Sequence, residues 1–390
     1  MMRSFALALL VVVNLSIARS ALAQGTVDDV IGFLVTNQAV QTGDFKKDQA
    51  AAQAARVAIS RALLIDLTSV PLATASSGFL YRLNPELGTV ERATDSFGAF
   101  FIERALTPGS GHASFGVSTS TSDFNQLDGR SLRDGALVTI ANKFRDEAAP
   151  FDTESLILHL RSSTMTIFGS VGIGSRLEIG AAIPMVRLTL DGQRLNVYRG
   201  DTLVQATGNA TASGLADLAI RGKLNLVATR SGGVAVAGEV RLPTGDASNL
   251  LGAGKASLRI MGIGSVENGP VSLHGNASML TGGISSEVDF GGALSVAVHP
   301  RVTLSGETLV RRLSELHALD LVAAPHPTLL GVDTYRLAPA VDPEMLAVVV
   351  TGLKWNLAHT AVIGGHLNWS LNHRGLTAPV TPTLTFEYAF

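Results

Sequence analysis

The stretch LTFEYAF, residues 384–390, alternates between two kinds of side chain. Its apolar parity holds Leu384, Phe386, Tyr388 and Phe390. Because successive side chains of a β-strand point to opposite faces, the stretch predicts a strand with one apolar face and one mostly polar face. On its own this pattern also fits a half-buried edge strand of a soluble sheet, so the rest of the chain must decide between them.

The same alternation recurs along most of the chain. From about residue 111 onward, segments of roughly ten residues alternate apolar and polar positions and are separated by turn residues. We count about twelve such strands, including 111–124, 155–171 and 175–189, with LTFEYAF as the last. One face of these strands is apolar and free of charge, and the other carries charged side chains at mid-strand. Lipid requires the first face and a wet interior suits the second, so the sequence predicts an all-β transmembrane antiparallel barrel.

The charged or polar parity identifies the side chains that we expect to line the interior of this barrel. The lumen-lining candidates are Asp217, Arg221, Lys223, Glu239, Arg241, Lys255, Arg259, Asp289, Glu307, Arg311, Lys354 and His366. One interpretation is a lattice of ion pairs that shapes the barrel. The other is a polar conduit whose slight basic excess favours anionic or amphiphilic solutes. The two can coexist.

The lengths of the connections alternate as well. Short links are expected at 172–175, 299–301 and 358–360, and long ones at 125–150 and 314–344. Short periplasmic turns and long external loops are typical of outer-membrane barrels. Aromatic residues make up only 5% of the chain, so Leu, Val and Ala must cover most of the lipid-facing surface.

The N-terminus, MMRSFALALLVVVNLSIARSALAQ, has the features of a secretory signal peptide. Arg3 gives a positive start, residues 5–17 are apolar, and Ala21-Leu22-Ala23 forms a small-x-small cleavage site. We expect residues 1–23 to be removed on export; an uncleaved anchor is the alternative, but the apolar stretch is short for a spanning helix. Together with the barrel this predicts the outer membrane of a Gram-negative bacterium.

Composition narrows the classes of function. The chain has no Cys, which excludes disulfides and an acylated N-terminal Cys, and its mean hydropathy is +0.30 with 46% apolar residues. A net charge of −2 gives no reason to expect nucleic acid as a partner. No metal-ligand spacing, phosphate loop or G-x-S-x-G appears, so we expect no cofactor, no metal and no catalytic residue.

Residues 24–108 differ from the barrel at 109–390. FKKDQAAAQAARVAISRALLIDL (45–67) is spaced for a helix, which Pro71 would end. We expect this region to form a plug of helix and loops in or under the lumen, with a separate periplasmic domain as the alternative. A hairpin within 76–95 could raise the strand count of the barrel to about fourteen.

Three segments carry a resemblance to a known family. SGLADLAIRGKLNL (213–226), GEVRLPTGDASNLLGAGKASLRI (238–260) and GIGSRLEIGAAIPMVRL (172–188) resemble the outer-membrane family named for the putative MetA pathway of phenol degradation. Its architecture is akin to fatty-acid and toluene channels, and the resemblance covers roughly residue 96 to the C-terminus. It implies a channel for small, hydrophobic or amphiphilic solutes, with phenol not carried over. The matching positions are Gly214, Asp217, Arg221, Lys223 and Leu226, followed by Leu242, Pro243, Thr244 and Gly245.

Two other functions stay open. A structural or adhesive barrel would have a sealed lumen and functional external loops. A lipid hydrolase would need a Ser and a His in contact, whereas the pairs Ser272/His274 and His366/Ser370 lie on single strands, where same-face neighbours are about 6.5–7 Å apart. The expected partners are outer-membrane lipid, a small-molecule solute and, as in outer-membrane proteins generally, the barrel-insertion machinery reading the strand that ends at Phe390. The oligomeric state stays open.

Overall fold

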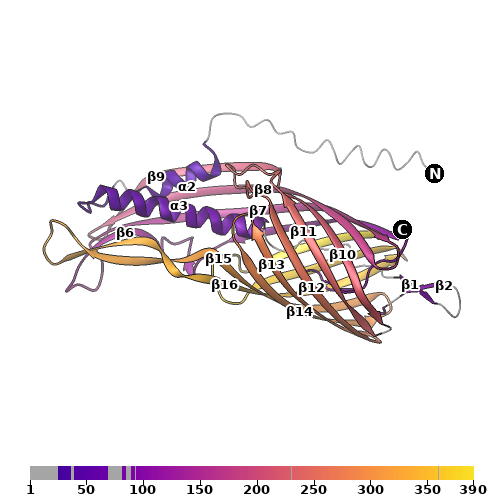
Figure 1. Ribbon diagram of the computed structural model, residues 1–390. Helices are drawn as coiled ribbons and strands as arrows, with labels where there is room; N and C mark the ends of the chain where they lie inside the picture. The colour runs from indigo at the N-terminus through magenta and orange to yellow at the C-terminus, as the bar shows by residue number, and fades with distance from the viewer. Residues whose placement is uncertain are drawn as a thin grey trace.

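The computed structural model describes residues 25–36, 39–68, 81–84, 89–92, 94–229, 231–358 and 360–390, with the backbone alone at 81–84 and 89–92. Figure 1 shows one elongated barrel with two helices against one end and the C-terminus at the other. The expected signal peptide and the expected helix stop at Pro71 lie outside the described residues.

Twelve antiparallel strands close into a barrel, as the alternation predicted. The closing strand is the one that contains LTFEYAF: it pairs with β17 on one side and with β3 on the other, where Phe386 lies opposite Val117. The strands are β3 (Ala113–Phe124), β7 (Asp152–Ile173), β8 (Leu177–Tyr198), β10 (Leu218–Thr229), β11 (Gly232–Leu242), β12 (Ser257–Asn268), β13 (Val271–Gly282), β14 (Glu287–His299), β15 (Val302–Pro325), β16 (Val332–Ala358), β17 (Ala361–Ser370) and β19 (Thr381–Ala389). The predicted all-β antiparallel barrel is confirmed.

The hairpin at 76–95 does not add two strands to the barrel, so the prediction of fourteen strands by that route was wrong. The hairpin at 76–95 exists as β1 (Tyr81–Asn84) and β2 (Thr89–Arg92), but it forms a separate two-stranded sheet. The two extra strands of the barrel sheet are instead β6 (Leu137–Phe144), between β7 and β16, and β9 (Asp201–Leu215), on β8. A small third sheet joins β4 (Gln126–Leu127), β5 (Arg130–Ser131) and β18 (Leu376–Thr377).

The connections at the end near the C-terminus are short, as expected: 174–176 and 300–301 are turns, and β17 begins at Ala361, soon after β16 ends at Ala358. At the other end, 125–151 is long and contains β4, β5 and β6. The long loop expected at 314–344 is wrong, because β15 and β16 continue through it and leave only residues 326–331 as a link. Register shifts around His317 break the alternation there, which is why the sequence pattern did not reveal the strands.

Large apolar side chains cover the outside of the barrel. They include Phe115, Ile179, Ile183, Ile220, Leu224, Val236, Ile260, Leu273, Met279, Phe290, Leu304, Leu353, Trp355, Ile363, Leu384, Phe386 and Tyr388, all exposed. Exposed charges flank this belt: Arg161, Arg187 and Arg312 at its helix-side rim, and Arg176 and Arg301 in the turns at the opposite end. An apolar belt between two charged rims is the surface that a bilayer stabilises.

The helices α2 (Val27–Val35) and α3 (Phe45–Thr68) cover the helix-side end of the barrel. The predicted helix at 45–67 is therefore confirmed, whereas α2, which begins with a capping box between Thr26 and Asp29, was missed. The wall is uneven at this end, because β10 to β14 have 11–13 residues and β7, β8, β15 and β16 have 22–27.

The two helices pack across the gap that the short strands leave (Figure 1). Leu34, Ile59 and Leu63 pack in one apolar core with Leu158 of β7 and Leu316 of β15. Within the described residues, no helix is both long and apolar enough to cross a membrane.

Candidate functional site: the barrel lumen

A chain segment that precedes the first barrel strand lies inside the barrel. We call residues 94–108 the lumen segment. Nearly all of its side chains are buried, including Phe97, Phe100 and Arg104. Sequence reasoning placed a plug in 24–108 and noted that SFGAFFIERAL (96–106) resembles a segment before the barrel in members of the same family. It did not narrow the plug to this stretch, because the stretch has neither strand nor helix periodicity.

Wall side chains hold the backbone of the lumen segment from several sides. The Phe97 N–H donates to Thr303 Oγ1 of β15 at 3.0 Å, and the Ala105 N–H donates to Ser265 Oγ of β12 at 2.8 Å. Asn225 of β10 in turn donates to the Ala105 carbonyl at 2.7 Å. These bonds satisfy backbone groups that no ladder satisfies, which is the condition for placing irregular chain in a buried site.

Glu307 makes the densest of these contacts. Its carboxylate accepts the N–H groups of Phe100, Phe101 and Ile102 at 2.5, 2.8 and 2.9 Å. Three donors on one carboxylate are charge-assisted bonds, which are stronger than neutral ones. Lys354 completes the clamp: its Nζ donates to the Ala99 carbonyl at 2.9 Å and lies 4.5 Å from the centre of the Phe100 ring.

The barrel wall carries small residues where the lumen segment carries large side chains. A Cβ on Gly352 would lie 2.4 Å from the Phe100 ring, and a Cβ on Gly291 would lie 2.2 Å from Ile102 Cδ1. Ala105 packs likewise among Ala235, Ala237, Met261 and Ile263. At these positions the side chains of the segment, and not those of the wall, fill the interior.

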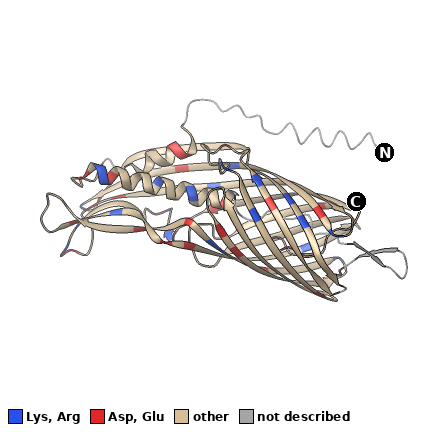
Figure 2. Ribbon diagram, in the orientation of Figure 1, with Lys and Arg blue, Asp and Glu red and all other residues tan. Residues whose placement is uncertain are grey.

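Ion pairs surround the segment on the wall. Arg259 pairs with Asp289, Arg311 pairs with Glu287 at 2.9 Å, and Lys223 pairs with Glu178 at 2.8 Å, all buried. Arg241 binds Glu239 at 2.8 Å within β11, and Arg221 pairs with Glu103 of the segment itself. Figure 2 shows the two signs of charge side by side on neighbouring strands. Opposite charges in contact lower the cost of keeping both away from water.

The structure places the twelve lumen-lining candidates as follows. Lys223, Arg241, Arg259, Asp289, Glu307, Arg311, Lys354 and His366 are buried, and Arg221 and Glu239 are half-buried. His366 packs its ring against Phe100, with 4.2 Å between ring centroids. Glu287, Glu103 and Arg104 belong to the same interior but were not among the candidates; parity with Asp289 could have revealed Glu287.

Two candidates have other surroundings. Lys255 is exposed, because β12 starts only at Ser257 and the alternation that we had extended back to Lys255 belongs to a turn; it does not line the lumen. Asp217 is buried, but it accepts the N–H groups of Gly245 and Ala253 at 3.1 and 2.7 Å and so holds the loop that follows β11.

One Ser–His contact does occur in the interior. His274 Nδ1 lies 3.0 Å from Ser265 Oγ on the neighbouring strand, and the same hydroxyl accepts the Ala105 N–H. The serine oxygen is thus engaged by the lumen segment, so the pair serves to hold that segment. Among the described residues, no group of three or more His, Asp or Glu side chains is arranged to hold a metal ion.

Comparison with known proteins gives likenesses of shape alone. No protein-family model matches the chain and no curated protein is significantly similar, so the MetA-pathway family is not confirmed. An outer membrane channel from Pseudomonas putida F1 is 13% identical, over 73% of this chain and 98% of that one, with a TM-score of 0.43. The P. putida toluene transporter TodX is 10% identical over 73% and 91%, with a TM-score of 0.36, and the NanC porin 6% over 61% and 98%, with 0.35. TM-scores this low carry no argument about function.

Proposed function

We propose that this protein is an outer-membrane channel or transporter for small hydrophobic or amphiphilic solutes, and that the lumen segment closes its path. One observation carries the proposal: the interior of the barrel is occupied by a separate stretch of chain, held by side-chain bonds to its backbone. A barrel whose role is only structural can fill its lumen with wall side chains, as small barrels do. Here the wall carries glycine or alanine where Phe100, Ile102 and Ala105 pack, so movement of the segment would free space at these positions.

The outer surface supports the membrane location. The apolar belt with its charged rims fits a bilayer, and the short turns at the C-terminal end fit the periplasmic side. Under this proposal α2 and α3 stand on the external side and the lumen segment forms the plug, so the plug is narrower than residues 24–108. Phe100 and Phe101 against His366 would give an apolar solute contacts along the path.

A sealed structural or adhesive barrel is the second candidate. The observation that favours it is the number of bonds on the segment, above all the three N–H groups on Glu307. In a sealed barrel these bonds would keep the lumen segment in place permanently.

Flux through reconstituted protein separates the two functions. The full chain in proteoliposomes should admit small amphiphilic solutes faster than protein-free liposomes do, and faster than it admits sugars of similar size. Rates equal to those of protein-free liposomes across the whole panel would overturn the channel proposal and leave the sealed barrel.

A further inference from the structure

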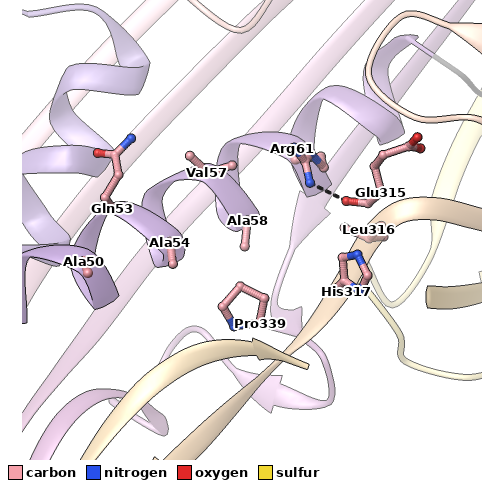
Figure 3. Close-up of a pocket in the computed structure, with 10 residues that line it drawn as sticks. All are labelled: Ala50, Gln53, Ala54, Val57, Ala58, Arg61, Glu315, Leu316, His317 and Pro339. Carbon is pink, nitrogen blue, oxygen red and sulfur yellow. Dashed lines mark hydrogen bonds between the residues drawn. The ribbon is translucent and has the colours of Figure 1, made fainter. Parts of the chain in front are cut away.

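A cavity lies outside the lumen, between α3 and the extended parts of β15 and β16. Its volume is about 490 Å³, within the range of about 300–1,000 Å³ that is typical of small-molecule sites. Figure 3 shows α3 along one side, with Ala54 and Ala58 facing Pro339 across the cavity; Val57 also lines it. The helix turns a different face, with Ile59 and Leu63, into the apolar core. The cavity therefore exists because this face of α3 carries small side chains.

The two ends of the cavity differ in chemistry. Ala50 and Gln53 line one end, and Arg61, Leu316 and His317 lie at the other (Figure 3). Arg61 Nη1 donates to the Glu315 backbone carbonyl, which fixes the guanidinium at this end. Glu315 also lines the cavity, but its carboxylate accepts from Ser285 Oγ at 2.8 Å and from the Ser286 N–H at 2.6 Å. Its negative charge is directed to that loop and away from Arg61.

We propose that this cavity binds an amphiphile with a single anionic head group, the head at Arg61 and His317 and the apolar chain along Ala54, Val57 and Ala58. An apolar trough with one cationic end matches such a ligand in both shape and charge. A neutral alcohol of equal length would fill the trough but offer the guanidinium no negative charge. A cationic amphiphile would meet like charge. The site would select the solute class of the proposed channel. Only the claim that the bound ligand goes on into the lumen rests on the proposed function.

The test is a calorimetric titration of the full chain in lipid nanodiscs, with empty nanodiscs subtracted. The probes are decanoate, decan-1-ol and decyltrimethylammonium. Decanoate should bind about ten-fold more tightly than the other two, since a charge-assisted head-group contact is the difference. Equal affinity for the three probes, or no binding of decanoate, would overturn the proposal.

Variants separate head-group recognition from a merely structural role. Arg61→Gln should lower the affinity for decanoate to that for decanol and leave decanol binding unchanged, whereas Arg61→Lys should keep the preference. Lys47→Gln, which removes the same charge from an exposed position on α3 away from the cavity, should behave as wild type. An unchanged preference in Arg61→Gln would refute the assignment.

Filling the trough with larger side chains should weaken the binding of decanoate and of decan-1-ol. Ala54→Leu and Val57→Phe occupy the cavity from two positions, so the result does not depend on one variant folding, and unchanged binding in the variant that folds would count against the site. The lumen is tested separately. If decanoate binds but no solute flux is seen, the site is supported and the channel proposal is overturned. If flux is seen but decanoate does not bind, the channel is supported and the site is overturned.

Discussion

Glu307 is the single residue on which the closed lumen depends most. Its carboxylate accepts three consecutive backbone N–H groups of the lumen segment, so one side chain fixes the conformation of residues 100–102. Strand alternation alone placed Glu307 on the inward face. It did not predict the bonds, because they need the irregular segment that alternation cannot detect.

Replacing Glu307 tests this role. Glu307→Gln leaves one acceptor oxygen and no charge, and hydrogen bonds to charged groups are worth about 1.5–3 kcal/mol each. We expect the segment to detach more often, seen as more frequent channel openings in planar bilayers. Glu147→Gln, which alters an exposed acid in the loop between β6 and β7, is the control. Openings as rare in Glu307→Gln as in the control would argue against the clamp.

Asp66, near the end of α3, gives the helix a pH dependence. Burial raises the pKa of this carboxyl from the usual 3.8 to about 6, and the positive charge of Arg311 partly opposes that rise. The folded state thus favours the protonated form, so α3 docking should be most stable below pH about 4 and weaken as the pH rises from there to about 6. Asp66→Asn should remove the dependence. The measurement is hydrogen exchange of α3 amides at pH 4.5 and 7.5; equal pH dependence in variant and wild type would contradict it.

At the scale of elements, the unequal lengths of the strands explain where the two helices pack. The short strands β10 to β14 leave one side of the barrel open beyond the apolar belt, and α2 and α3 cover the core that this would expose. The sequence predicted α3, which has 24 residues and is rich in Ala, and missed α2, which is only nine residues long. It also missed the extensions of β15 and β16, because bulges near His317 shift their parity.

The helix-side core should be held by the buried face of α3. Leu63 is fully buried among the leucines of β7 and β15, so Leu63→Ala should lower the stability of helix docking by about 2–5 kcal/mol. Phe45→Ala, at a ring that is 77% exposed on the same helix, should have little effect. Limited proteolysis at α3 checks both, and equal cleavage rates in the two variants would disprove the packing described here.

At the scale of the whole molecule, the strands of the barrel wall could be predicted from the sequence, whereas the segment inside the lumen could not. Alternation of apolar and polar residues follows from lipid on one side and a polar interior on the other, so about twelve strands and their facing could be predicted. The lumen segment obeys no such period, since its contacts are with strands far away in the sequence. Two candidates have surroundings that alternation did not predict: Lys255 lies in a turn, where the alternating pattern continues by chance, and Asp217 holds the loop that follows β11.

The most direct test of the account is to lock the lumen segment to the wall. The chain has no Cys, and the hydroxyl of Ser96 contacts that of Ser272 on β13, so Ser96→Cys with Ser272→Cys creates one crosslink between segment and wall. Single-channel conductance of the double variant is recorded under oxidising and then reducing conditions, with Ser272→Cys alone as control. We expect oxidation to abolish openings and reduction to restore them, in the double variant only. Openings that persist in the fully crosslinked protein would show that solutes do not depend on movement of the segment, and would contradict the account.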